Sequence, residues 1–323
     1  MLDVHLDEAD LARELRADVR AGFTADPRRT SPKYFYDARG SDLFEEITRL
    51  PEYYPTRTER SILDQRAAEI ARITEAKTLI EIGSGSSEKT RLLLDALLGH
   101  GTLGSFVPLD VSASALSAAV ESLTAAYPGL SVRGVVGDMT RHLRHLPDGD
   151  NRLIAFLGGT LGNLVPGERA GFLGALRSVL HEGEWLLIGA DLVKDPAVLV
   201  PAYDDAAGVT AEFNRNVLHV INRELGADFD PSAFQHVARW DPEHEWIEMR
   251  LRALSEQRVV IPALSLDVTF AAGEELHTET SAKFRREGLA AELAAAGFTT
   301  RHFWTDPAGW FSVTLAQAGR PGA

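Results

Sequence analysis

The sequence predicts an α/β protein with a doubly wound, Rossmann-like sheet and a second, α+β lobe. Short apolar runs alternate with helical segments from about residue 78 to residue 191, which is the pattern of a parallel sheet with crossover helices. Between residues 192 and 283 the rhythm changes to two helical stretches followed by alternating polar and apolar runs. A helix and a hairpin after residue 284 then complete the sheet domain.

The strands predicted for the sheet domain are five short apolar runs. They cover residues 78–82, 105–109, 132–136, 153–157 and 185–190. Helices predicted over residues 88–98 and 114–126 separate some of these strands. The tail predicts a helix over residues 286–296, closed by Gly297, and a hairpin of residues 298–304 and 310–316.

The second lobe is predicted to be inserted into the sheet domain. Its helices cover residues 195–204 and 209–225, and its alternating runs cover residues 235–240, 246–253 and 265–270. An amphipathic helix over residues 9–21 and an aromatic, proline-containing segment precede the sheet domain. We expect residues 1–58 to join residues 192–283 in this lobe, and residues 59–191 and 284–323 to form the sheet domain.

Composition narrows the range of partners. The 323 residues carry a formal charge of −14, which argues against a nucleic-acid backbone as partner. We see no secretory signal and no apolar run long enough to span a bilayer. The absence of cysteine excludes disulfides and thiolate sites and fits the cytoplasm. We therefore expect a cytoplasmic monomer that acts on a small molecule, without a nucleic-acid or membrane partner.

Residues 78–90 begin like two phosphate-binding loops and depart from both at Glu88. A dinucleotide fingerprint and a Walker loop each require glycine at this position, and a carboxylate there would repel phosphate. The apolar strand, the turn at Gly83 and Gly85 and the helix start still describe a loop where the backbone meets a nucleoside-bearing ligand. A nucleoside without phosphate fits best, and S-adenosyl-L-methionine (SAM) is such a ligand.

Acidic residues follow two further predicted strands, at the sheet edge where Rossmann-like folds bind ligands. Asp110 is suited to ribose hydroxyls, and Asp138 could accept a hydrogen bond from an adenine amino group. Each carboxylate could instead cap a turn or a helix. Lys89 could reach the carboxylate of the cofactor or be a solvated lysine, and both alternatives remain open.

Nearly the whole chain resembles one family, the SAM-dependent histidine N-alpha-methyltransferases of ergothioneine biosynthesis, which convert histidine to hercynine. The matching runs cover residues 33–37, 40–44, 50–59, 83–90, 156–163, 191–195, 202–210, 213–216 and 279–284. Such runs are far more specific than a Gly-x-Gly turn. The resemblance implies a class I methyltransferase sheet that binds SAM and a lobe that binds the substrate.

The resemblance also implies roles for single residues. Tyr53, Asn163 and Tyr203 would hold the amino and carboxylate groups of L-histidine, with Tyr53 and Asn163 as the catalytic residues. Tyr36, Glu279 and Ser281 would surround the imidazole. The SAM-binding residues would be Gly83, Gly85, Lys89, Asp110, Asp138 and Met139. Met139 stands where we expect the family to place phenylalanine against the adenine, and Gly159 where we expect serine.

The chemistry of these side chains suits N-methylation. Methyl transfer needs a neutral amine, which burial favours and which Tyr53 or Asn163 can orient by hydrogen bonding. Glu279 can accept an imidazole N–H, and Ser281 can bond the other ring nitrogen. We expect no metal site, since His142 and His145 lack zinc-site spacing and lie beside arginines.

Other functions are also compatible with the sequence. A methyltransferase of the same fold could act on another amino acid or a small amine. A nicotinamide-dependent oxidoreductase would keep the fold but conflicts with Glu88 at the pyrophosphate position. A binding module without activity would bind SAM or histidine and leave the histidine unmethylated.

Overall fold

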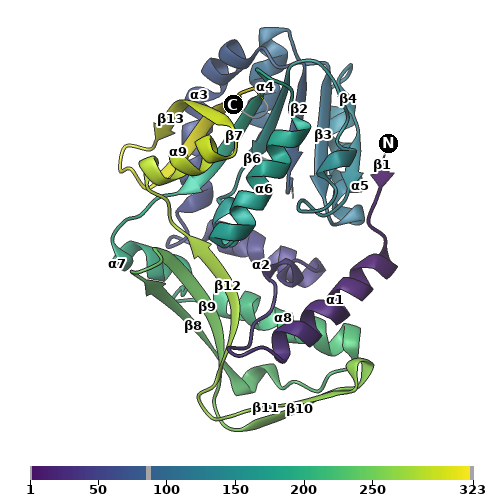
Figure 1. Cartoon of the computed structure of the whole chain (residues 1–323), viewed down its shortest axis with the longest axis vertical. Coiled ribbons are helices and arrows are strands. Elements are labelled where there is room, and N and C mark those ends of the chain that lie inside the picture. Colours follow the sequence, from purple (N-terminus) through teal and green to yellow (C-terminus); the bar gives the residue numbers. More distant parts are fainter. Residues whose placement is uncertain (1, 85–88, 321–323) are drawn as a thin grey trace. The chain divides into compact units, whose positions relative to one another are not determined.

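The structure is a computed structural model of the whole chain, and it describes residues 2–84 and 89–320. The chain divides into two compact units. Unit 1 contains Met1–Asp7, Pro55–Val193 and Phe284–Ala323, and unit 2 contains Glu8–Tyr54 and Lys194–Lys283. Each unit is therefore assembled from segments that are distant in the sequence (Figure 1).

Unit 1 is built on a mostly parallel sheet (Figure 1). Across the sheet the strands are β1 (Leu2–Val4), β5 (Gly134–Val136), β3 (Ser105–Asp110), β2 (Thr78–Ile82), β6 (Arg152–Phe156), β7 (Trp185–Asp191), β14 (Phe311–Ala318) and β13 (Phe298–Thr305), and β4 (Ser131–Val132) pairs with β3. Among the described strands of this sheet, the pairs β13–β14 and β14–β7 are antiparallel, and the other pairs are parallel. The predicted Rossmann-like sheet with a terminal hairpin is confirmed.

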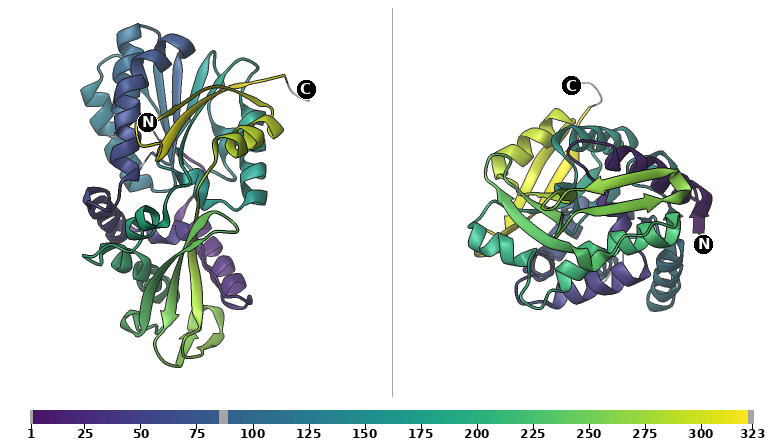
Figure 2. Two further views of the ribbon diagram at one scale, coloured as in Figure 1. Left: turned by 90° about the vertical axis from the view of Figure 1, so that its left-hand side faces the viewer. Right: turned by 90° about the horizontal axis from the view of Figure 1, so that it is seen from below.

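Helices cover both faces of this sheet (Figure 2). On one face lie α3 (Pro55–Thr74), α4 (Thr90–His100) and α5 (Ala113–Ala126), and on the other lie α6 (Pro166–Val179) and α9 (Arg286–Ala295). Leu63 of α3 and Leu94 of α4 are fully buried with Leu79 of β2. On the opposite face the ring of Phe172 in α6 packs on Phe156 of β6, with centroids 4.8 Å apart. Burial of these apolar side chains is the main stabilising term in unit 1.

The boundary of the sheet domain differs from the prediction at its N-terminal side. Among the described residues, 2–7 and 55–58 belong to unit 1 and not to the second lobe, as do residues 192 and 193 at the other boundary. Leu2–Val4 pairs in parallel with Gly134–Val136, and a three-residue strand is too short to show a sequence period. Pro55 opens α3, because proline has no N–H to lose at the first turn of a helix.

A buried ion pair joins the amino-terminal ends of β6 and β7, two adjacent inner strands of the sheet of unit 1. The guanidinium of Arg152 donates to the carboxylate of Glu184, with Nη2 2.6 Å from Oε2, and the two side chains are 3% and 5% exposed. Desolvation alone would raise the pKa of Glu184. The hydrogen bonds from Arg152 and from backbone N–H groups outweigh it, so the pKa of Glu184 lies below its usual value.

Unit 2 combines an antiparallel sheet with helices. The sheet has the order β12 (Glu275–Ala282), β9 (Trp246–Ala253) and β8 (Phe234–Asp241), and β10 (Gln257–Ile261) and β11 (Leu266–Phe270) form a hairpin. Its helices are α1 (Glu8–Phe23), α2 (Ala38–Arg49), α7 (Pro196–Leu199) and α8 (Val209–Leu225). The expected helix over residues 195–204 is only α7 and the 3₁₀ turn η4 (Val200–Ala202), since Pro201 has no N–H for an α-helical bond.

Phenylalanine rings form part of the core of unit 2. Phe270 of β11 makes edge-on contacts with Phe23 of α1, Phe229 and Phe234 of β8, at centroid distances between 5.4 and 6.2 Å. This geometry is the favoured one for aromatic pairs. Among the described residues, no helix of either unit combines the length and apolar character needed to cross a bilayer.

Candidate active site

Strand β12 of unit 2 carries Glu279 and Ser281 on one face. Side chains two apart on a strand point the same way, and Lys283 continues the series, because its N–H bonds the carbonyl of Glu245. The register of β12 against β9 shifts between His277 and Glu279. Such a bulge reverses the alternation, so that His277 pairs with Arg250 on the face opposite to Glu279.

Aromatic side chains from three other segments line this part of unit 2. Tyr36 follows the 3₁₀ turn η1 (Pro32–Phe35), and its ring lies 5.5 Å from Phe44 of α2. Phe44 contacts Tyr53 at 6.1 Å, and Tyr53 contacts Tyr203 at 6.5 Å. All three contacts are edge-on. The structure thus brings Tyr36, Tyr53 and Tyr203 into one arc, although 167 positions separate the first from the last.

Glu279 is a buried carboxylate that pairs with no side chain among the described residues. It is 8% exposed, lies directly across from the buried Met249, and accepts no hydrogen bond from any described side chain. Desolvation raises the pKa of Glu279 to about 7, against the opposing effect of the Lys283 charge. A buried acid without a protein partner is the kind of group that a ligand satisfies.

Tyr36 is electrostatically coupled to Glu279. Desolvation raises the pKa of Tyr36 well above its usual value, and Glu279, Tyr53 and Tyr203 raise it further. Tyr36 is nevertheless 40% exposed, and its hydroxyl bonds none of the described residues. This phenol therefore stays protonated at neutral pH and can donate a hydrogen bond.

Ser281 and Tyr203 are joined by a buried lysine. Their oxygens lie 2.8 Å apart, and the ammonium of Lys283 donates to Tyr203 Oη at 2.7 Å and to Ser281 Oγ at 2.8 Å. Lys283 is 4% exposed and also lies over the ring of Tyr203. The sequence prediction did not include Lys283, although its spacing from Glu279 and Ser281 on a strand would have placed it on their face.

In unit 1 the predicted cofactor residues lie at the carboxyl ends of parallel strands. Gly83 follows β2 with φ +69°, a conformation that favours glycine, and a Cβ there would meet no atom of the described residues within 4 Å. Asp110 ends β3, and one of its oxygens accepts from the N–H of Ser112 at 3.0 Å. The capping role that the sequence left open is therefore real for Asp110. Gly85 lies outside the described residues.

Asp138 follows β5 and is held by its neighbours. Its Oδ1 accepts from the N–H of Thr140 at 2.6 Å, while its own N–H donates to Nδ1 of His142 at 2.9 Å. The other carboxylate oxygen bonds none of the residues that the structure describes. Met139 is the half-buried next residue of this turn. His142 thus orients the turn, and the described residues hold no cluster that could bind a metal ion.

Lys89 has a partner that the sequence did not reveal. Its ammonium bonds the carboxylate of Glu59, a fully buried residue of α3. The same carboxylate accepts from the N–H of Gly158 at 2.8 Å and lies where a side chain at Gly189 would be, since a Cβ there would sit 1.8 Å from Oε1. Glu59 therefore ties α4 to the loop after β6. The hydrogen bonds and the burial of Glu59 reveal this role, and no pattern in the sequence predicts it.

Asn163 lies in that loop, at the end of the 3₁₀ turn η3 (Thr160–Asn163). It is half-buried, and its amide bonds none of the described residues. Gly158 and Gly159 precede it with φ of +81° and +72°. The left-handed backbone explains why glycine suits position 159, where the family resemblance led us to expect serine.

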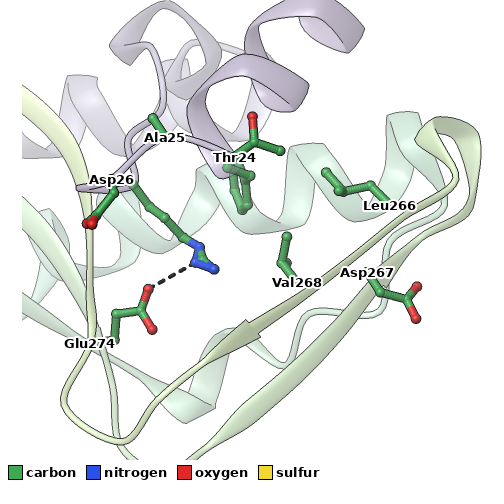
Figure 3. A pocket seen from close by; sticks show the side chains of 9 residues that line it. Thr24, Ala25, Asp26, Leu266, Asp267, Val268 and Glu274 are labelled. Atoms are coloured by element: carbon green, nitrogen blue, oxygen red, sulfur yellow. Dashed lines mark hydrogen bonds and ion pairs between the residues drawn. The ribbon is translucent and has the colours of Figure 1, made fainter.

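A pocket of unit 2 lies away from these residues. It has a volume of about 550 Å³, and two of its lining residues, Arg28 and Glu274, form an ion pair 3.0 Å long. Figure 3 shows this pocket. Its lining residues are Phe23, Thr24, Ala25, Asp26, Arg28, Leu266, Asp267, Val268 and Glu274. None of the predicted substrate residues lines it. The candidate site is therefore the Tyr36 and Glu279 region and not this pocket.

Comparison with known proteins agrees with the resemblance seen in the sequence. The family model described as histidine-specific, SAM-dependent methyltransferase matches residues 15–318. The histidine N-alpha-methyltransferase of Mycolicibacterium smegmatis is 58% identical, covering 95% of this chain and 96% of that protein. The protein of the same name from Mycobacterium tuberculosis is 56% identical, covering 97% of each chain.

A third relative is a larger protein. Ergothioneine biosynthesis protein 1 of Neurospora crassa is 36% identical over 205 residues, which are 62% of this chain and 23% of that protein. The predicted resemblance is confirmed by the family match and by the two bacterial relatives. The chain belongs to the family of SAM-dependent, histidine-specific methyltransferases.

Proposed function

We propose that this protein transfers three methyl groups from SAM to the α-amino nitrogen of L-histidine, forming hercynine for ergothioneine biosynthesis. The observation that carries the proposal is the buried carboxylate of Glu279, which pairs with no described side chain, on the same strand face as the hydroxyl of Ser281. These two groups match the N–H and the second nitrogen of an imidazole. The names of the relatives, histidine N-alpha-methyltransferase and ergothioneine biosynthesis protein, support the same reaction.

The residues of unit 1 fit the cofactor. No described residue would contact a Cβ at Gly83, which suits a ligand against the backbone, and the second carboxylate oxygen of Asp138, which bonds no described residue, suits an adenine amino group. We assign Asp110 to the ribose hydroxyls, Lys89 to the cofactor carboxylate and Met139 to the adenine face, with Gly85 in the same loop. When bound, SAM supplies an electrophilic methyl group on a sulfonium centre.

We assign recognition of the acceptor substrate to residues of unit 2 and to Asn163. Tyr53, Asn163 and Tyr203 would hold the amino and carboxylate groups, and Tyr53 and Asn163 would orient the lone pair of the neutral amine. Tyr36, Glu279 and Ser281 would hold the imidazole. The faces of the tyrosine rings suit the diffuse positive charge of a trimethylated nitrogen.

The specificity of the site follows from unsatisfied polar groups. A leucine or phenylalanine side chain would leave Glu279 and Ser281 without partners in a buried place. Each unpaired group costs about 1–3 kcal/mol, and more for a charge, so the two together give roughly a hundredfold discrimination or more. No strong base beside the amine is required, because water can take the proton once the amine is buried.

The test is the Glu279→Ala variant with a panel of amino acids and small amines as acceptors. We expect kcat/KM for histidine to fall by at least tenfold, while the dissociation constant of S-adenosylhomocysteine measured by calorimetry stays within about twofold. Unchanged histidine kinetics would refute the role of Glu279. Faster methylation of another panel member by the wild type would replace histidine as the substrate.

We further propose that the enzyme acts as a monomer in the cytoplasm without a nucleic-acid partner. The net charge of −14 and the absence of cysteine support this. Light scattering of the purified chain and fractionation of cells test it. A stable dimer or a membrane-bound fraction would contradict it.

A further inference from the structure

Lys283 is the one buried ammonium of unit 2 that the reaction scheme above leaves without a role, among the residues that the structure describes. It lies at the end of β12, two positions after Ser281, and donates to both Ser281 and Tyr203. Burying a lysine costs free energy unless it is paired. Here the ammonium is paired with the two hydroxyl groups, and its charge acts on Glu279, the proposed ligand of the imidazole.

The hydrogens of this cluster can be assigned from chemistry. An ammonium only donates, so Lys283 fills one lone pair on each oxygen. The 2.8 Å contact between Tyr203 Oη and Ser281 Oγ holds one further hydrogen. A phenol is a stronger acid than an alcohol, so Tyr203 is the better donor of the two. Ser281 then accepts twice, and its own hydrogen must point elsewhere.

We propose that Lys283 is a positioning residue that makes Ser281 an obligatory donor, so that the pocket binds a neutral imidazole with its N–H on Glu279 and its lone pair on Ser281. This inference rests on the proposed function and specifies the chemical form of the substrate. An imidazolium would present a second N–H to the hydrogen of Ser281, so two donors would face each other without an acceptor. The positive charge of Lys283 opposes the same form.

The inference defines the class of acceptor. The ring must carry an N–H donor and, at its second position, a nitrogen with a free lone pair. The pyrrolylalanines keep the N–H and lack the lone pair, so they would leave the hydrogen of Ser281 unpaired. The unpaired hydrogen should lower the affinity for the pyrrolylalanines roughly tenfold or more relative to histidine.

The first test uses the unmodified protein. Histidine labelled with ¹⁵N in the ring is bound with S-adenosylhomocysteine at about pH 7.5, and its nitrogen shifts are measured by NMR. We expect one N–H nitrogen and one hydrogen-bonded acceptor nitrogen, which is a single neutral tautomer. Shifts of two protonated nitrogens would overturn the inference.

The second test compares Lys283→Met with Lys194→Met. Lys194 donates to Tyr54 Oη at 2.8 Å and lies over that ring, so it reproduces the lysine–tyrosine contact without a serine. Binding of histidine and of the pyrrolylalanines is measured by calorimetry with S-adenosylhomocysteine present. In Lys283→Met the preference for histidine should fall about tenfold, because Ser281 can turn its hydrogen to Tyr203.

The outcomes separate the two proposals. An unchanged preference in Lys283→Met, or an equal loss in Lys194→Met, would overturn the positioning role and leave histidine methylation intact. Failure of the wild type to bind histidine at all would overturn the proposed function together with this inference. If Lys283→Met does not fold, the NMR measurement on the wild type decides alone.

Discussion

Replacing Glu279 by glutamine should stabilise the protein in a pH-dependent way. The substitution keeps the shape of the side chain and removes a charge that is 8% exposed and accepts no hydrogen bond from the described residues. Desolvation raises the pKa of this carboxyl from 4.5 to about 7. The folded state therefore binds the proton more tightly than the unfolded state, so stability falls as the pH rises from about 4.5 through about 7.

The magnitude follows from that rise in pKa. Each pH unit between the two values costs about 1.4 kcal/mol, so ionised Glu279 lowers the free energy of unfolding by about 3 kcal/mol at pH 8. At pH 5 the carboxyl is protonated in the folded state and about three-quarters ionised in the unfolded state, so the cost has fallen to under about 1 kcal/mol. The difference at pH 8 corresponds to roughly 6–12 °C in melting temperature.

The assay is thermal unfolding of the ligand-free wild type and of Glu279→Gln between pH 5 and pH 8. We expect the variant to melt higher at pH 8 and the gap to close toward pH 5. Glu256→Gln is the matched control, because Glu256 is an exposed glutamate of the same unit. A difference in melting temperature that is constant with pH, or a variant that is less stable at pH 8, would refute the claim that ionised Glu279 destabilises the ligand-free protein.

Three further substitutions test other parts of the structure. Gly189→Ala places a Cβ against the carboxylate of Glu59, so it should lower the melting temperature and weaken S-adenosylhomocysteine binding by calorimetry, whereas Gly174→Ala, a helix position with open space, should be neutral or stabilising by about 0.5–1 kcal/mol. Arg152→Met should cost about 3–5 kcal/mol in urea unfolding, because its buried carboxylate partner loses its counter-charge. Met139→Phe should tighten S-adenosylhomocysteine binding about 2- to 10-fold by offering an aromatic face to the adenine.

Each of these has a result that would contradict it. Full cofactor affinity in Gly189→Ala would mean that Glu59 does not organise the cofactor end of unit 1. Unaltered urea unfolding of Arg152→Met would show that the buried pair is compensated by its surroundings. Weaker binding by Met139→Phe would indicate that this side chain does not face the purine.

The sheet of unit 1 could be predicted because its strands are buried on both faces and read as apolar runs. Thr78–Ile82 was predicted to the residue, and the run over residues 132–136 is two strands, β4 and β5, broken at Arg133. Short strands could not be predicted in this way. Leu2–Val4 is a strand only because Gly134–Val136 offers it a partner, and such long-range pairing leaves no local period.

The candidate site shows a similar division. Glycines and acids at strand ends could be found from the sequence, because parallel strands bring their carboxyl ends to one edge. The hydrogen-bond partners of those residues could not be found from the sequence. Glu59 is part of an ordinary helix in the sequence, and only the fold buries it against Lys89 and Gly158. The bulge that separates His277 from Glu279 likewise depends on pairing with β9.

The most direct measurement of the central claim is the product formed from L-histidine and SAM with labelled methyl groups. The wild-type chain is incubated with both compounds, and the product is fragmented by mass spectrometry. The account predicts three labelled methyl groups on the α-nitrogen and none on the ring. Histidine that stays unlabelled, or that carries label on an imidazole nitrogen, would contradict it.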